Sequence, residues 1–398
     1  MNNQPDSSIS AVHDAVIIGG GLVGASLALA LQSAGLDVAL IEPQPPQPRP
    51  DAPAWDSRIY AISPGNAAFL ASLGAWSRLD AQRVQRVEAM AIFGDERAGR
   101  LDFSAYDAGL RELAFIVEGG ALQRALREGM AAGSGIRMFS PAQAAGMTVS
   151  ADGAQVMLVD GAALKAQLVV GTDGGDSWVR REAGIAARVS DYRQLGVVAN
   201  FDIEKPHHGT AFQWFRPDGV LALLPLPGNR VSMVWSTAVE QAQTLLALDA
   251  QALADAVADA SQGAVGRLRL IAPAAGFPLR LTHVARLIAP RVALAGDAAH
   301  NVHPLAGQGV NLGFRDAREL AAVLAARAPR QDCGEWSLLR RYERARREDI
   351  AAIELSTDAL QKLFGARSVW VSGARNFGLG AVNRLPLLKN LLIRHAVA

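Results

Sequence analysis

The hydrophobic pattern at the start of the chain predicts a buried parallel strand followed by a helix. Residues 15–18 are a continuous apolar run, as expected for a strand that is covered on both faces. A glycine-rich turn at 19–24 follows, and residues 25–31 are small and apolar, which indicates a buried helix. The segment 37–41, which is apolar after Asp37, predicts the next strand. This order of elements is typical of a nucleotide-binding α/β fold.

Two later segments repeat the pattern of a strand that ends in a glycine turn bearing an acid. Residues 168–171 are apolar and lead to Asp173-Gly174 and then to the start of a helix. Residues 291–295 precede Gly296-Asp297, and a glycine-punctuated loop at 304–309 then leads into a long alanine-rich helix. Such a loop leaves backbone N–H groups free at a helix N-terminus, where the dipole favours anions or an electron-rich ring. A carboxylate combined with backbone donors is what a nucleotide cofactor needs.

The middle of the chain follows a different period. Short strand-like runs are separated by turn residues such as Asp218-Gly219 and Gly228-Asn229, which predicts an antiparallel sheet. A single helix over residues 242–261 is expected to lead back to the first fold. The pattern therefore predicts an α/β fold in which a Rossmann-like domain carries an inserted antiparallel-sheet domain and a helical C-terminus. The expected strands of the insertion are residues 196–203, 210–215, 220–224 and 230–235.

Composition narrows the class of protein. The chain has 398 residues, of which 50% are hydrophobic, and a formal net charge of +1, which gives no footprint for nucleic acid. Cys333 is the only cysteine, which excludes disulfides within the chain, iron–sulfur clusters and thiolate zinc sites. The first ten residues lack the pattern of a secretory signal, and no apolar run of about 18 residues is free of charge. We therefore expect a cytoplasmic protein.

The first glycine turn carries the clearest chemical signal. Gly19, Gly21 and Gly24 fit the G-x-G-x-x-G fingerprint: the first allows a tight turn, the second lets the backbone approach a pyrophosphate, and the third lets helix and strand pack closely. Glu42 ends the second strand about 20 residues downstream, where an acid grips a ribose hydroxyl. An ordinary strand–helix turn is the alternative, but the strand, helix, second strand and acid in register favour a dinucleotide site.

Taken together, the glycine turn, Asp173-Gly174 and Gly296-Asp297 resemble the para-hydroxybenzoate hydroxylase superfamily of flavoprotein aromatic hydroxylases in order and spacing. Further blocks are similar to the ubiquinone-biosynthesis hydroxylases within that superfamily, and the similarity covers the chain from about residue 14 to its end. Two positions depart from the family's pattern: Trp214 stands where members often carry Arg, and Gly219-Val220 where they often carry Gly-Pro. The similar blocks are residues 56–63, 220–227, 303–313, 357–364 and 387–394.

The resemblance implies a FAD-dependent monooxygenase that uses NADH or NADPH and O2 to hydroxylate the aromatic ring of a polyprenylated phenol or quinol intermediate of ubiquinone biosynthesis. The oxygen donor in that family is a flavin C(4a)-hydroperoxide, from which the protein must exclude water. A soluble hydroxylase of a small phenol is one alternative, and a flavin-bearing, low-turnover assembly or lipid-binding subunit is another. The implied FAD-binding domain comprises residues 1–80, 101–186 and 282–345, the substrate domain residues 81–100 and 187–281, and a C-terminal helical segment residues 346–398.

The resemblance also implies roles for residues of the cofactor site. The glycine turn is expected to hold the FAD pyrophosphate, Glu42 the adenosine ribose and Gln123 the adenine side. Arg58 is expected to reach the pyrophosphate, with a surface ion pair as the alternative. Asp173 is expected to support FAD and the approach of the nicotinamide, and Gly296-Asp297 to bind the ribityl chain. The expected contacts of the isoalloxazine ring, through backbone N–H groups, are Gly307, Gly309, Val310 and Asn311.

His300 and His303 flank the loop that is expected to pass the flavin. A metal site at this spacing lacks an evident third ligand, and Pro304 fixes the loop, so packing beside the flavin is favoured and no metal is expected. His303 and Pro304 are the catalytic candidates, with His303 as a hypothetical acceptor for a phenol proton.

The predicted sheet supplies the candidates for the substrate wall, which are Gln213, Phe215, Leu223 and Pro225. Alternation shows which residues of a strand share a face, but not which face meets the ligand. Simple sheet core is therefore the alternative for each of the four.

The end of the chain, residues 385–398, has an apolar helical face beside Lys389, Arg394 and His395. Such a segment either lies on a membrane surface or, more commonly, docks on its own protein. The polyprenyl substrate implied by the resemblance adds weight to the membrane, so we expect a cytoplasmic protein and keep a peripheral contact at the inner face of the membrane as an open alternative. Other ubiquinone-biosynthesis proteins and a second copy of the chain are further partner candidates.

Overall fold

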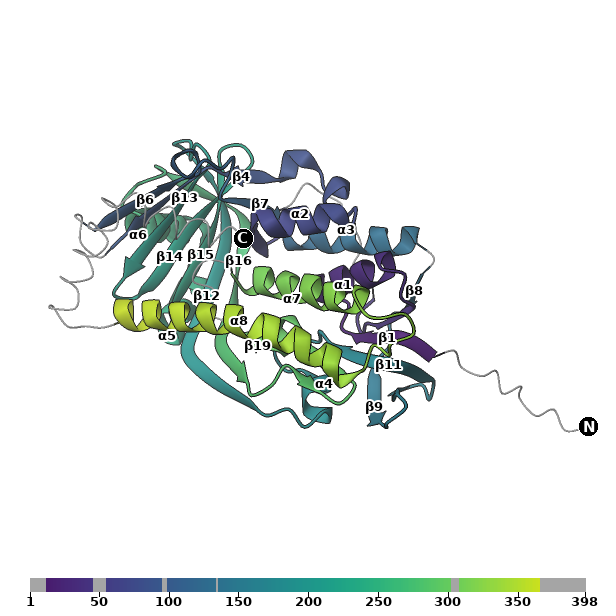
Figure 1. Cartoon of the computed structure of the whole chain (residues 1–398). Coiled ribbons are helices and arrows are strands. Elements are labelled where there is room, and N and C mark those ends of the chain that lie inside the picture. The colour runs from purple at the N-terminus through teal and green to yellow at the C-terminus, as the bar shows by residue number, and fades with distance from the viewer. Residues whose placement is uncertain (1–11, 46–54, 95–98, 134, 302–307, 366–398) are drawn as a thin grey trace, which may run out of the picture.

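The computed structural model describes residues 12–45, 55–94, 99–133, 135–301 and 308–365. Within them the chain forms two large sheets that lie side by side, each with its own helices (Figure 1). His303, Pro304, Gly307 and the segment 385–398 lie outside the described residues. The first sheet comprises β1 (Val12–Ile18), β2 (Val38–Ile41), β8 (Ile136–Phe139), β9 (Ala144–Val149), β10 (Ala154–Leu158), β11 (Ala163–Gly171), β17 (Ile288–Ala289) and β18 (Val292–Leu294).

The first sheet is parallel at its centre, in the strand order β18-β11-β1-β2-β8, and the β9–β10 hairpin joins β11 on one side. Helix α1 (Leu22–Ser33) packs between α3 (Gly119–Ala132) and α7 (Gln308–Ala325), and its residues from Gly24 to Leu31 are all buried. This burial explains why the helix consists of small and apolar residues. The predicted strand, helix and second strand are therefore confirmed.

The second sheet is mostly antiparallel and has the order β19-β16-β12-β15-β14-β13-β5-β6. The expected short strands are present, and the first of them is longer than expected because β12 begins at Ala187. Only β5 pairs in parallel, with β13. The strands are β5 (Ala89–Phe93), β6 (Arg100–Ser104), β12 (Ala187–Ile203), β13 (Thr210–Arg216), β14 (Gly219–Leu226), β15 (Arg230–Ala238), β16 (Leu268–Val284) and β19 (His300–Asn301).

The helix expected over residues 242–261 is two helices, α5 (Val239–Ala247) and α6 (Ala250–Ala260). The break occurs because Asp249 is extended and caps α6: its carboxylate accepts a hydrogen bond from Ala252 N at 2.8 Å. Both helices pack on one face of the second sheet. The α/β fold with an inserted antiparallel sheet is confirmed, whereas the exact division into domains stays a prediction.

A small third sheet connects the two large ones. Its strands are β3 (Ile59–Ile62), β7 (Ala114–Glu118) and β4 (Gln85–Val87). The long helix α8 (Trp336–Gly365) runs beside α7 and is yellow-green in Figure 1; the expected boundary at residue 346 falls inside it. The remaining short elements are α2 (Pro64–Ser72), α4 (Trp178–Glu182) and the 3₁₀ turns η1 (Trp76–Arg78), η2 (Ala81–Arg83), η3 (Tyr106–Ala108) and η4 (Gly296–Ala298).

Candidate cofactor site

The glycine turn after β1 leaves space where a pyrophosphate needs it. Gly19 has φ of +105°, and a Cβ there would collide with the Thr172 carbonyl oxygen. A Cβ on Gly24 would collide with the Gly19 carbonyl oxygen, so this glycine lets α1 approach the turn. At Gly21, in contrast, no atom of the described part of the chain lies within 4 Å of the Cβ position. The first and third glycines are thus required by the fold, and the second opens the backbone to a ligand.

Glu42 and Gln123 hold the same turn from two sides. Gly20 N donates to Glu42 Oε2 at 2.6 Å, and Gln44 N donates to Oε1 of the same carboxylate at 2.8 Å. Gln123 Nε2 donates to Gly20 O at 2.7 Å. The structure therefore brings the two predicted residues together at Gly20. Glu42 is half-buried at the end of β2, which is the position expected for a ribose ligand.

The Asp173 carboxylate points into the start of α4. It accepts hydrogen bonds from Ser177 Oγ and Trp178 N, both at 2.6 Å, and from Val179 N at 3.0 Å. The adjacent Thr172 Oγ1 donates to Gly19 O at 2.7 Å, which ties this turn to the first glycine turn. Both oxygens of Asp173 are thus engaged in capping α4, and its expected contribution to the cofactor site stays a prediction.

The third motif is built around a left-handed glycine. Gly296 has φ of +63°, and Val23 of α1 lies 3.1 Å from its Cβ position. Asp297 follows with an exposed side chain. Desolvation by the surrounding protein raises the pKa of Asp297 above its ordinary value, against a lowering by the nearby His300. An accessible carboxyl in these surroundings is suited to hydrogen bonding with sugar-alcohol hydroxyls.

His300 is buried, and its Nε2 lies 2.6 Å from Asp316 Oδ2. Burial alone would lower the pKa of His300, but the charge of Asp316 and their hydrogen bond raise it overall. Burial would raise the pKa of Asp316, yet His300 and Arg346 lower it. Both shifts favour the charged forms of the two side chains, and Nε2 of His300 faces the Asp316 carboxylate.

The side chain of Asn311 has a structural role, and the expected contact of its backbone N–H with the isoalloxazine stays a prediction. Its side chain is buried, and Oδ1 accepts hydrogen bonds from Ser63 N and Asn66 Nδ2, both at 2.9 Å. Its Nδ2 donates to Ala61 O at 2.7 Å. The side chain thus joins the start of α7 to the segment between β3 and α2. Among the described residues, none places an atom within 4 Å of the Cβ position of the neighbouring Gly309.

Arg58 is exposed, and its guanidinium makes no ion pair with a carboxylate of the described residues. Its backbone is held by Asp56, whose Oδ1 accepts from Arg58 N at 2.9 Å and whose Oδ2 accepts from Gly120 N at 2.8 Å. Asp56 thus joins this segment to the N-terminus of α3. The arrangement presents Arg58 near the residues that hold the glycine turn and leaves its charge available.

The two faces of the second sheet meet different parts of the molecule. Trp214 and Leu223 pack in one core with α5 and α6, on what we call the helix face. On the opposite side, the inner face, Ala211 of β13 packs with Ile116 of β7 in the third sheet. The inner face is therefore the one directed toward the cofactor motifs.

The substrate-wall candidates divide between these faces. Gln213 and Phe215 alternate with Trp214 and lie on the inner face. Leu223 and Pro225 lie on the helix face, because the register pairs them with Met233 and Val231 of the helix-side core. Their place in a substrate wall stays a prediction. Their side chains point away from the first sheet. Alternation within each strand is correct in the prediction, but the register between β13 and β14 is what decides the face.

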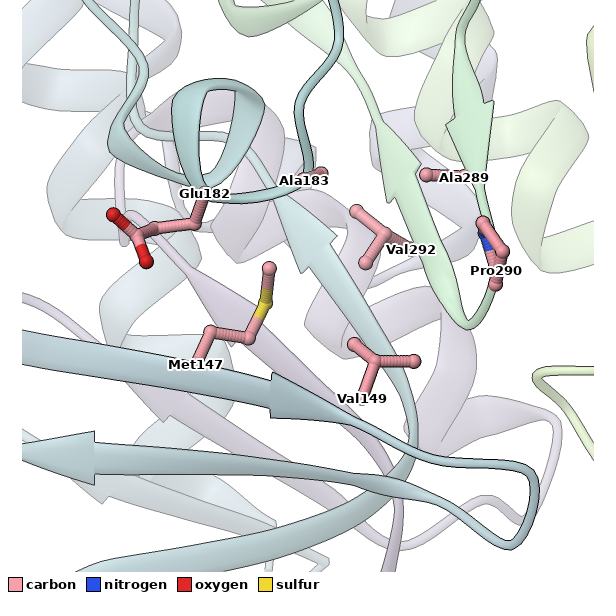
Figure 2. Close-up of a pocket in the computed structure, with 7 residues that line it drawn as sticks. All are labelled: Met147, Val149, Glu182, Ala183, Ala289, Pro290 and Val292. Atoms are coloured by element: carbon pink, nitrogen blue, oxygen red, sulfur yellow. The ribbon is translucent and has the colours of Figure 1, made fainter.

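Two cavities of the described residues lie elsewhere. One of about 330 Å³ is bounded by the β9–β10 hairpin, the end of α4 and the β17–β18 turn; in Figure 2, Met147 and Val149 point toward Val292, while the Glu182 carboxylate points away. The cofactor motifs follow the carboxyl ends of β1, β11 and β18, whereas this cavity lies at the beginning of β18. The cavity therefore lies at the opposite end of the strands from the cofactor motifs.

Comparison with known proteins defines the class. The sequence family described as FAD binding domain matches residues 13–356. PqsL from Pseudomonas aeruginosa, a probable FAD-dependent monooxygenase, has a solved structure with a TM-score of 0.74 and 25% identity, covering 93% of this chain and 99% of that chain. Together with the open glycine turn and the accessible Asp297, these matches define a FAD-dependent flavoprotein monooxygenase, a class for which NAD(P)H and O2 are typical co-substrates.

The relatives define the family within this class. The chain is 35% identical over 391 residues to the ubiquinone hydroxylase UbiL of Rhodospirillum rubrum. This match covers 98% of this chain and 90% of the relative. It is 32% identical to the 3-demethoxyubiquinol 3-hydroxylase of Escherichia coli, over 100% of both chains. The chain belongs to the FAD-dependent hydroxylases of ubiquinone biosynthesis, which confirms the expected family, cofactor and enzyme class. In the described part of the chain, no helix has the length and apolar character that crossing a membrane requires.

Proposed function

We propose that the chain hydroxylates the aromatic ring of a polyprenylated phenol or quinol intermediate of ubiquinone biosynthesis, with NADH or NADPH and O2 as co-substrates. The observation that carries this proposal is the inner face of the second sheet, which is directed toward the cofactor motifs and is largely apolar in β14. FAD supplies the redox and oxygen-activating chemistry when it is bound. The chain's own residues bind it, orient the substrate and exclude water.

Within this proposal, the roles in FAD binding follow the geometry. Gly21 leaves the backbone open for the pyrophosphate, and Arg58 supplies the positive charge. Glu42 binds the adenosine ribose, and Gln123 acts by holding Gly20. The exposed Asp297 binds the ribityl hydroxyls. The proposed domain division assigns these residues to the FAD-binding part, and residues 81–100 and 187–281 to the substrate part.

The proposed substrate wall consists of Gln213 and Phe215 with Val220 and Ala222 on the paired strand. Gln213 is about nine-tenths buried, so its amide is a polar group within a mainly apolar wall. An amide in this position can donate a hydrogen bond to an oxygen on the substrate ring, while the apolar neighbours cover the ring and the prenyl chain. His303, outside the described residues, is proposed as the acceptor of the phenol proton. An unchanged pH profile of hydroxylation in His303→Gln would contradict that role.

The test is NAD(P)H oxidation by the FAD-loaded enzyme with two kinds of phenol. A prenylated phenol is expected to stimulate oxidation and to give a product heavier by one oxygen in mass spectrometry. Stimulation by small polar phenols only would instead support a soluble hydroxylase. Absence of stimulation by either, in an enzyme that retains FAD, would favour the low-turnover subunit. Deletion of the gene in its host should cause a quinone precursor that lacks one hydroxyl to accumulate.

We also propose a peripheral membrane contact through residues 385–398, motivated by their basic amphipathic pattern and by the membrane location of a polyprenyl substrate. Liposome flotation of the full chain, compared with a chain ending at residue 384, tests this contact. Flotation with anionic vesicles is expected only for the full chain. Equal flotation of both proteins would show that the segment does not anchor the enzyme.

A further inference from the structure

A buried network of charged side chains lies directly behind the turn that carries Asp297. Asp316, on α7, accepts a hydrogen bond from Gly296 N at 2.9 Å on Oδ2, the oxygen that also contacts His300. Its Oδ1 accepts from Arg346 Nε at 2.7 Å, and Arg346 belongs to α8. Asp316, His300 and Arg346 are all buried. One carboxylate therefore joins the turn, the strand β19 and the helix α8.

Helix α8 reaches the same region at a second point. Tyr342 is fully buried, and its hydroxyl donates to Leu294 O at 2.8 Å, at the end of β18. Arg346 also forms an ion pair with Asp349 at 2.7 Å, and Asp349 pairs in turn with Arg315 of α7 at 3.2 Å. The end of the strand and the turn that follows it are thus both fixed from α8. The turn itself is tight, because Gly296 has a left-handed backbone and rests on Val23.

Packing alone does not require charges at this place. Burying an ion pair costs desolvation that often cancels its attraction, and apolar residues of similar volume would fill the space as well or better. What apolar residues would not supply is an acceptor for Gly296 N and a fixed partner for His300. These two contacts set the orientation of the backbone from which the Asp297 side chain projects.

We propose that Asp316 is a positioning residue for FAD: it fixes the Gly296–Asp297 turn so that the Asp297 carboxyl faces the cofactor, and Arg346 of α8 is its counter-charge. Asp316 is fully buried, whereas Asp297 is exposed, so Asp316 acts through the turn and does not touch the cofactor. This inference rests on the assignment of Asp297 to the ribityl chain in the proposed function.

The experiment separates positioning from stability by removing the buried charges together. Asp316→Asn removes the buried negative charge shared by Arg346 and His300 and leaves Arg346 only its ion pair with Asp349. It is therefore expected to destabilise the apoprotein and to weaken FAD binding by about tenfold or more. The double variant Asp316→Asn with Arg346→Met removes both charges. It is expected to regain most of the thermal midpoint of the apoprotein, but to keep the weakened FAD affinity and a shifted midpoint potential of the bound flavin.

A matched control is available on the same sheet. Asp332 pairs with Arg291 at 2.9 Å, at the beginning of β18 and away from the Gly296 turn. Asp332→Asn is expected to lower the thermal midpoint while leaving the FAD dissociation constant and the flavin potential unchanged. FAD affinity is measured by titrating the apoprotein and following flavin fluorescence, and the midpoint potential by spectroelectrochemistry.

Two outcomes would overturn the proposal, and they differ. If the double variant regains wild-type FAD affinity and potential together with stability, while Asp297→Asn binds FAD weakly, then Asp316 has only a structural role. If Asp297→Asn binds FAD like the wild type, then the ribityl assignment is wrong, and the positioning role falls with it. Weak binding by Asp297→Asn and by the double variant, with normal binding by Asp332→Asn, supports both.

Discussion

Replacing Asn311 with Ala removes the amide that ties the start of α7 to the segment between β3 and α2. The side chain is 2% exposed, so water cannot take over its hydrogen bonds without a local opening. Ser63 N and Ala61 O each lose a buried partner, while Asn66 Nδ2 keeps one bond, to Asn311 O at 3.1 Å. Because α7 begins beside the proposed flavin loop, the variant is expected to affect both stability and FAD binding.

The magnitude follows from the two main-chain groups that are left unpaired. Leaving a buried polar group without a partner costs about 1–3 kcal/mol. Two such groups give an expected loss of about 2–6 kcal/mol in the free energy of unfolding, which is at the upper end of the range for single substitutions. A loss of the same size is expected for Leu126→Ala, in the core around α3, where a large-to-small substitution costs about 2–5 kcal/mol.

Leu126→Ala is therefore a matched control in the same half of the molecule. Urea unfolding of the apoproteins gives the free energies, and titration with FAD gives the affinities. We expect both variants to be destabilised, but only Asn311→Ala to bind FAD about tenfold more weakly. The reasoning is refuted if Asn311→Ala unfolds within about 0.5 kcal/mol of the wild type, as a surface substitution would. Equal FAD affinities of the two variants would refute the link to the cofactor site.

Three further predictions test the glycine turn, the sheet faces and the buried ion pair. Gly21→Val should leave the apoprotein stable but abolish FAD binding, whereas Gly24→Ala should lower the thermal midpoint of the apoprotein itself, because only the latter Cβ collides with the backbone. Leu223→Ala should lower the free energy of unfolding by about 2–5 kcal/mol without changing KM for a prenylated phenol. Gln213→Leu should change that KM. A changed KM in Leu223→Ala with an unchanged KM in Gln213→Leu would mean that Leu223, and not Gln213, contacts the substrate. The raised pKa of His300 means that its protonated form stabilises the fold below about pH 6.5 and that this contribution is lost as the pH rises through the raised pKa. The free energy of unfolding should therefore fall more steeply above about pH 6.5 in the wild type than in His300→Gln, and parallel curves would contradict the ion pair.

The cofactor half of the fold is predictable because its signals are local. An apolar run, a glycine turn and a small-residue helix follow one another within residues 15–31. Each of these segments restricts which structure its neighbours can form. Strand β16 gives no such signal, because Pro273, Gly276 and Pro278 are typical of a loop. They are tolerated in the structure because β16 pairs with β12 along its length, while its other side pairs, within the described residues, with β19 only at Thr282 and His283. The second edge is open where the prolines lie.

The buried network behind Asp297 had a sequence signal, but an incomplete one. Asp316 stands four residues from both Leu312 and Leu320, so it lies in the apolar stripe of α7. Arg346 has the same relation to Tyr342 and Ile350 in α8. A charge within an apolar stripe indicates a buried ion pair. The pairing of these two residues depends on how α7 packs on α8, which one sequence does not specify.

The two positions that depart from the family's pattern have different consequences in the structure. Trp214 is 1% exposed on the helix face, where its ring stacks on Phe93 at 5.3 Å and on Phe212 at 5.9 Å between centroids. Val220 is half-buried on the inner face, opposite Phe215. A change at Trp214 therefore alters core packing, whereas a change at Val220 alters the wall proposed for the substrate.

Substrate preference within the family is accordingly expected to depend on Val220 and not on Trp214. Val220→Leu should change the ratio of kcat/KM for two prenylated phenols that differ in their ring substituents, because one added methylene in an apolar pocket is worth about 1–3 kcal/mol. Trp214→Phe should lower the free energy of unfolding and leave that ratio unchanged, because its side chain packs against α5 and α6. A changed ratio in Trp214→Phe together with a wild-type ratio in Val220→Leu would mean that the substrate meets the opposite face of the sheet from the one we assign.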